Sequence, residues 1–145
     1  MMKTEQIKDY SQFLAVLDDF EDVFPRLSSR VSLNDYVKKT VKYGNVFVVY
    51  DGEKPAALIS FYDNDLQSKN AFVTLVGVKS EYRRRHLGTQ LLALCENDAK
   101  NAGMKTISLE VRKEKDGAIA FYSDNGYKEY KRSNEAVFMK KDLNI

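Results

Sequence analysis

The chain has 145 residues, of which 43% are hydrophobic and 30% are charged, and this predicts one globular domain over residues 1–145 with a sizeable core. Its 23 lysines and arginines nearly balance 21 aspartates and glutamates, so the formal net charge is only +2 and gives no reason to expect a nucleic acid partner. The single cysteine, Cys95, excludes an intramolecular disulfide and suits a reducing compartment. No apolar run has the length of a signal peptide or a membrane span, so we expect a cytoplasmic protein without a membrane partner.

The hydrophobic pattern predicts an alternation of strands and helices along the chain. The Asp51-Gly52 pair between two β-rich runs is a hairpin signal, and the nearly continuous apolar run 71–78 is typical of a strand that is covered on both faces. The expected elements are a strand at 3–8, helices at 10–24 and 32–44, two strands within 45–62, a strand at 71–78, a helix from 87 to about 103, a strand at 106–111, a helix within 116–126 and two strands within 126–143.

The helix between the strands at 71–78 and 106–111 implies a right-handed parallel crossover. The whole order of elements predicts an α/β fold, of the α+β type, around a mixed and largely covered sheet.

The segment YRRRHLG, residues 82–88, places three arginines and a histidine where a strand gives way to a helix. The first amides of a helix are unpaired and carry a partial positive charge, so they bind phosphate well. Arginines around such a turn suit a ligand with several phosphate groups. A solvated charged corner is the alternative interpretation. The glycine-rich loops of phosphate-loop NTPases and of dinucleotide-binding folds are absent.

At this turn the chain resembles the GNAT superfamily of N-acetyltransferases, and the resemblance covers nearly all of it. In that family the central strand is followed by Arg or Gln, two residues, Gly, one residue, and then Gly or Ala. Arg83 stands at the first position and Gly88 at the last, whereas His86 stands where glycine is usual. An imidazole there either crowds the pyrophosphate or contacts a phosphate.

A second stretch, LEVRKEKDGAIAFYSDNGY, is similar to a later strand-to-helix segment of the same family. Lys115 occupies the position of a family Asn that supports the coenzyme, and it offers a cation in its place. The matching residues are Ala118, Ile119, Phe121, Tyr122 and Gly126, with Tyr127 in place of the usual Phe.

The resemblance implies a mixed, mostly antiparallel sheet of about seven strands, flanked by about four helices, with a parallel β-α-β unit that binds acetyl-CoA. It implies direct transfer of the acetyl group to an amine of a small molecule or peptide, without a covalent acyl-enzyme or a metal, and it is compatible with a homodimer. Gly77 inside a strand indicates a bulge, a close ligand approach or a tight packing contact. The coenzyme-binding residues implied are Val76, Gly77, Val78, Arg83, Arg84, Arg85, His86, Leu87, Gly88, Thr89, Lys115 and Tyr122.

Tyr122 matches the family's tyrosine near the coenzyme sulfur, and a phenol stays protonated at neutral pH, so it is the expected general acid. Glu110, between Leu109 and Val111, is the expected base, acting directly or through water, with Glu81 in reserve. The alternative for Tyr122 is a buried aromatic ring that only packs, and the alternative for Glu110 is a carboxylate that pairs with a neighbouring lysine.

The acceptor is less well defined. Arg26 and Arg30 could hold a carboxylate or phosphate of the acceptor, with Phe24, Phe61 and Tyr62 as apolar walls. Solvated arginines and core aromatics are the interpretation that the residues by themselves favour. Two other functions stay open: a CoA-binding module that has lost turnover, and an RNA-binding domain that uses the arginines and tyrosines.

Overall fold

The computed structural model describes residues 2–25, 27 and 32–143. Within this range one sheet of seven strands is flanked by four α-helices. The elements are β1 (Met2–Ile7), α1 (Tyr10–Asp18), α3 (Leu33–Tyr43), β2 (Asn45–Asp51), β3 (Lys54–Tyr62), β4 (Asn70–Val78), the short 3₁₀ helix η1 (Ser80–Tyr82), α4 (Leu87–Asn101), β5 (Thr106–Arg112), α5 (Asp116–Asp124), β6 (Lys128–Arg132) and β7 (Ala136–Asp142).

The strands follow the order β1-β2-β3-β4-β5-β7-β6 across the sheet. Every neighbouring pair is antiparallel except β4 and β5, which run parallel and are joined through α4. The predicted mixed, mostly antiparallel sheet with one parallel crossover is therefore confirmed.

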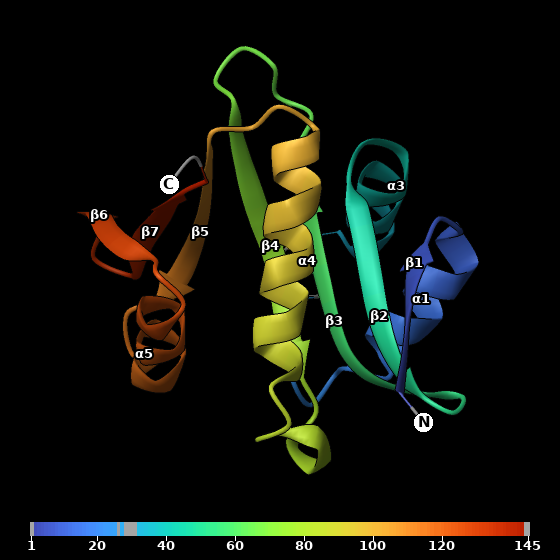
Figure 1. The fold of residues 1–145 in the computed structure, drawn as a ribbon. Helices are drawn as coiled ribbons and strands as arrows, with labels where there is room; N and C mark the ends of the chain where they lie inside the picture. Colours follow the sequence, from blue (N-terminus) through green and yellow to red (C-terminus); the bar gives the residue numbers. More distant parts are fainter. Residues whose placement is uncertain (1, 26, 28–31, 144–145) are drawn as a thin grey trace.

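Helices cover both faces of the sheet (Figure 1). On one face α4 packs against the sheet, and Leu91, Cys95 and Ala99 contribute its buried stripe to the larger core cluster. On the other face α1 and α3 bury Phe13, Leu17 and other apolar side chains in a second cluster. Apolar residues therefore alternate between two cores along the central strands.

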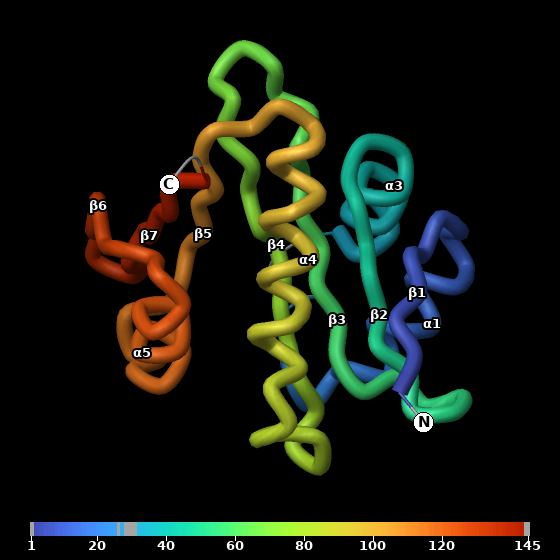
Figure 2. The backbone as a smooth tube through the Cα atoms, viewed as in Figure 1, coloured from blue at the N-terminus to red at the C-terminus, as the bar shows by residue number. Residues whose placement is uncertain are grey.

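The parallel strands β4 and β5 separate part of the way along the sheet (Figures 1 and 2). They pair from Asn70 to Val73 of β4, whereas β3 stays paired with β4 as far as Val78. The N–H of Lys79 bonds to the carbonyl of Ala56 at 2.9 Å. Because N–H groups alternate in direction along a strand, those of Val76 and Val78 point toward the gap between β4 and β5.

A β-bulge in β4 lies at Thr74, where the register with β3 jumps from Leu75–Ser60 to Val73–Phe61. Gly77 pairs regularly with Leu58, so the interpretation of Gly77 as a bulge is wrong. The bulge is held by side-chain hydroxyl groups, because the Tyr36 hydroxyl of α3 lies 2.7 Å from Oγ of Ser60 and 3.0 Å from Oγ1 of Thr74.

The first helix is shorter than the sequence pattern predicts. It ends at Asp18 rather than near Phe24, and the chain continues in turns, with the N–H of Phe20 bonded to the carbonyl of Leu17 at 2.9 Å. Acidic side chains are unfavourable at the negative end of a helix, and the segment after Leu17 reads DDFED. The apolar spacing continues past Asp18 because these turns also pack against the sheet.

Candidate active site

A cavity of about 880 Å³ lies where β4 and β5 separate and where α4 and α5 both begin. Its volume is in the range of small-molecule and cofactor sites. Its lining contains the open edge of β4, the turn before α4 and the start of α5. The lining residues are Val23, Val76, Gly77, Val78, Tyr82, Arg83, Arg84, His86, Leu87, Gly88, Thr89, Glu114, Lys115, Asp116, Gly117, Ala118, Phe121 and Tyr122.

The first turn of α4 faces this cavity with unpaired amides. The N-cap residue, His86, makes no side-chain capping bond and adopts the left-handed conformation, with φ of 62°. A glycine at this position in relatives is explained by this backbone conformation, which a residue with a Cβ adopts at a cost of roughly 1 kcal/mol. The imidazole is exposed and lines the cavity, so the amides of the turn and the ring can both face an anion.

The three arginines do not share one environment. Arg83 and Arg84 line the cavity, and Arg84 is also left-handed, with φ of 67°. Arg85 turns away from the cavity, and its guanidinium carbon lies 5.2 Å from the ring centroid of Tyr82. Two of the three predicted arginines therefore line the cavity, and the third stacks on an aromatic ring.

Two glycines of the site are explained by close packing. A Cβ at Gly88 would lie 2.9 Å from Cζ of Phe121, so Gly88 allows the first turn of α4 to approach α5. A Cβ at Gly77 would lie 2.6 Å from Cζ of Phe24 and 2.7 Å from Cγ1 of Val23. Of the alternatives for Gly77, the tight packing contact is observed, and the chain that follows α1 is thereby held over the open edge of β4.

Tyr122 is buried, with 8% of its surface exposed, and lines the cavity. Its ring is held edge-on between Phe121, at 5.3 Å between centroids, and Tyr127, at 6.0 Å. Burial raises the pKa of the Tyr122 phenol above its ordinary value, so the group stays neutral. Among the described residues the hydroxyl has no hydrogen-bond partner, which leaves it free to donate to a ligand.

Glu110 lies on the opposite side of β5 from the larger core. Leu109 and Val111 belong to that core, so Glu110 between them points to the face that carries α1 and α3, where it is exposed. It lines neither this cavity nor the two smaller ones described below. Glu110 and Tyr122 therefore lie on opposite sides of β5, because Tyr122 belongs to the larger core.

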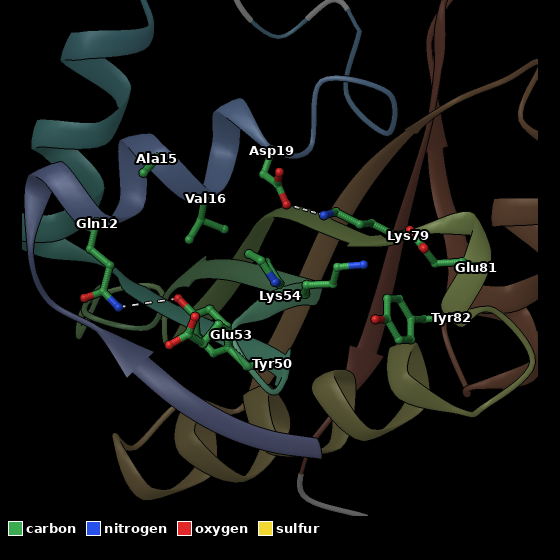
Figure 3. Close-up of a pocket in the computed structure, with 11 residues that line it drawn as sticks. Gln12, Ala15, Val16, Asp19, Tyr50, Glu53, Lys54, Lys79, Glu81 and Tyr82 are labelled. Atoms are coloured by element: carbon green, nitrogen blue, oxygen red, sulfur yellow. Dashed lines mark hydrogen bonds and ion pairs between the residues drawn. The ribbon is translucent and has the colours of Figure 1, made fainter. Parts of the chain in front are cut away.

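Glu81, the reserve base, belongs to a different cavity of about 480 Å³ between α1, the β2–β3 hairpin and η1. Figure 3 shows this cavity, with Lys79 directed toward Asp19 and forming an ion pair with it. Lys79 therefore lines this second cavity and does not line the larger one. Tyr82 lines both cavities, and its hydroxyl donates to Asp51 at 2.7 Å.

Two predicted acceptor residues, Arg26 and Arg30, lie outside the described residues. Phe61 is fully buried and stacks on Phe47 at 6.1 Å between centroids, so it is a core aromatic and cannot form the wall of an open site.

Sequence reasoning missed several residues that line the site or adjoin it. Val23 was predicted within a helix and was given no role, and Arg112 and Glu114 showed no pattern that distinguishes them from surface charges. Phe24, by contrast, was expected as an apolar wall of the acceptor site. A third cavity of about 560 Å³, lined by Val23, Phe24, Pro25, Leu27, Leu75, Arg112, Glu114 and Lys115, brings them together. Among the described residues no group of three or more His, Cys, Asp or Glu side chains is arranged to hold a metal ion.

The sequence and the fold are both similar to those of known proteins. Residues 12–127 match the family model described as the acetyltransferase (GNAT) family. The chain belongs to this family, because the match covers well over half of its length. A comparison with curated protein sequences found no match.

Several solved structures share the fold at low sequence identity. The ribosomal-protein-S18-alanine N-acetyltransferase of Escherichia coli is 21% identical with a TM-score of 0.79, over 100% of this chain and 96% of that one. The PaiA N-acetyltransferase of Thermoplasma acidophilum, in complex with coenzyme A, is 16% identical with a TM-score of 0.71, over 97% and 99%. The IAA acetyltransferase of Bacillus cereus is 13% identical with a TM-score of 0.73, over 98% and 99%. None of the described helices has the length and apolar character needed to cross a bilayer.

Proposed function

We propose that this protein transfers an acetyl group from acetyl-CoA to an amine by direct attack, without a covalent acyl-enzyme. The observation that carries the proposal is the convergence, in one cavity, of the uncapped amides of α4, two arginines, the open edge of β4 and the buried phenol of Tyr122. Each feature matches one part of a coenzyme thioester, which has a polyanionic end, a chain with amide groups and a sulfur atom.

The residues of this chain would divide the binding task by chemistry. The amides of 87–89, together with Arg83 and Arg84, would hold the phosphates, because helix N-termini and arginine forks both favour them. His86 and Lys115 lie on the same cavity and would add cationic contacts. The N–H groups of Val76 and Val78 would bind the amide-containing arm as a strand edge binds a peptide.

Acetyl-CoA, when bound, supplies the activated acyl group, so the residues of the site have only to position and to move protons. Tyr122, kept neutral by burial, would donate a hydrogen bond and then a proton to the departing sulfur. Glu110, directly or through water, would accept the proton that the amine loses. The amine would then approach from the α1 and α3 face, opposite Tyr122.

A thermal-shift titration of the purified protein with acetyl-CoA and with CoA tests the binding step. We expect a concentration-dependent rise in Tm, because a ligand that binds only the folded state stabilises it. Thiol release in the presence of an amine panel then tests turnover. Stabilisation without thiol release for any amine would favour the alternative, a CoA-binding module, and no stabilisation at millimolar ligand would refute both.

A further inference from the structure

The third cavity, lined by Arg112 and Phe24 among others, adjoins the cavity of about 880 Å³ that we propose for the coenzyme, which is called the coenzyme cavity below. The two cavities share Val23, Glu114 and Lys115. Val23, Phe24 and Leu75 pack against the core on the α1 and α3 face, so the third cavity opens on that face. It therefore meets the coenzyme cavity at the gap between β4 and β5, on the side to which Glu110 points.

The walls of this cavity combine apolar and cationic surfaces. The apolar residues are Val23, Phe24, Pro25, Leu27 and Leu75. The charged residues among those described are Arg112, Glu114 and Lys115, which leaves an excess of one positive charge. A volume of about 560 Å³ suits a small molecule.

Arg112 is oriented by its neighbour on the chain. Its Nε donates to Oε1 of Glu114 at 2.6 Å, and this bond holds the pKa of the Glu114 carboxyl below its usual range. Among the described residues no partner is found for the two terminal nitrogens of Arg112. A guanidinium that is held by Nε presents these terminal groups to another carboxylate.

We propose that this cavity binds the acceptor and selects amines that carry a carboxylate and an apolar side chain, as apolar amino acids do. The inference rests on the proposed function, because it names the acceptor of the same reaction. The carboxylate binds the terminal nitrogens of Arg112, the side chain lies among Phe24, Leu75 and their neighbours, and the amine faces the gap.

In the transfer the amine nitrogen forms a bond to the acetyl carbon and the bond from this carbon to sulfur breaks. The nitrogen loses a proton to Glu110 or water, and the sulfur receives one from Tyr122, so the products are an N-acetyl amino acid and free CoA.

The test compares acceptors that differ in the carboxylate alone. Initial rates of thiol release are measured with acetyl-CoA and phenylalanine, phenylalaninamide or phenylethylamine, each at matched concentrations of neutral amine. We expect kcat/KM for phenylalanine to exceed the other two by about tenfold or more, the usual effect of a charged hydrogen bond. Arg112→Gln should lower kcat/KM for phenylalanine to the level of phenylalaninamide, and it should reduce the rate with phenylethylamine far less than the rate with phenylalanine. Lys113→Gln is the matched control, because Lys113 is exposed and lines none of the three cavities.

Equal rates for the three acceptors, or an equal loss for all of them in Arg112→Gln, would overturn the inference while the proposed function stands. The inference also fails if acetyl-CoA raises the Tm and only amines that lack a carboxylate react. If acetyl-CoA does not bind at all, the proposed function itself fails, and the thermal shift distinguishes this case from the others.

Discussion

Gly77 of β4 and Phe24 lie so close together that no side chain fits between them. A Cβ at position 77 would lie 2.6 Å from the tip of the Phe24 ring. The contact between Gly77 and Phe24 sets how the segment after α1 lies over the open edge of β4. The N–H groups of Val76 and Val78 lie on this same edge.

Gly77→Ala should therefore destabilise the protein and weaken coenzyme binding together. Overpacking in a tight contact costs about 1–3 kcal/mol, and the displaced ring lies beside the cavity. Chemical denaturation and calorimetry with CoA measure the two effects. Phe24→Leu, which shortens the opposing side chain, should restore part of the lost stability in the double variant, and a fully additive result would show that the two residues are not coupled.

Tyr122→Phe should lower kcat by about a hundredfold, because the phenol no longer protonates the departing sulfur. CoA affinity and Tm should change little, since the ring keeps its packing against Phe121 and Tyr127. Tyr130→Phe serves as the control, because Tyr130 is exposed on β6. A wild-type rate in Tyr122→Phe would reduce this residue to a packing role.

The arginines of the turn before α4 should differ in their effect on coenzyme binding. Arg83→Gln and Arg84→Gln should each weaken CoA binding by about tenfold, because both line the cavity and would contact phosphate. Arg85→Gln should have little effect, since its side chain stacks on Tyr82. Calorimetric titration of the three variants decides the matter, and equal losses would mean that the turn acts only through its summed charge.

His86→Gly should stabilise the fold but weaken coenzyme binding. Glycine adopts the left-handed conformation of residue 86 without strain, so the free energy of unfolding should rise by about 1 kcal/mol. The loss of the imidazole from the cavity should cost several-fold in CoA affinity. Tighter binding would instead show that the ring crowds the pyrophosphate. Arg84→Gly, at a second left-handed position of the same turn, gives another test of the strain.

Asp63 should make stability depend on pH. It is buried at the end of β3 beside Asp98 of α4, its Oδ1 accepts a bond from Asn45 at 2.9 Å and its Oδ2 is without a hydrogen-bond partner. Burial, and next the neighbouring carboxylate of Asp98, which can share a proton with Asp63 and repels its negative charge, raise the pKa of Asp63 to about 7. The folded state therefore holds this proton more tightly than the unfolded chain, whose pKa is about 3.9.

The resulting contribution to stability is fully present below about pH 4 and is lost as the pH rises through 7. Asp63→Asn keeps the shape and removes the charge, so it should be more stable than wild type at pH 8 by on the order of 1 kcal/mol, because solvent near Asp98 screens part of the effect. The two proteins should converge near pH 4. Parallel denaturation curves at all pH values would show that Asp63 is ionised throughout.

Much of the fold could be predicted from the sequence because it depends on local patterns. Apolar spacing predicted the strands and helices, and Asp51-Gly52 predicted the hairpin, where Gly52 has a φ of 63°. The end of α1 was predicted wrongly, because apolar residues in turns continued the helical spacing. The candidate site could be located by its arginines and by the two motifs, but Arg85 and Phe61 could not be excluded from it, since the direction of a side chain depends on its tertiary neighbours.

The sequence alone determined the order of the elements, the parallel crossover and the turn at Arg83 where an anion can meet the start of a helix. These follow from residue spacing and helix-end chemistry, which act over a few residues. The tertiary structure decided which groups face each other: Phe24 with Gly77, Phe121 with Gly88, Asp63 with Asp98, and Tyr122 and Glu110 on opposite sides of β5. Such pairs arise from packing between segments far apart in the chain, and no local pattern encodes them.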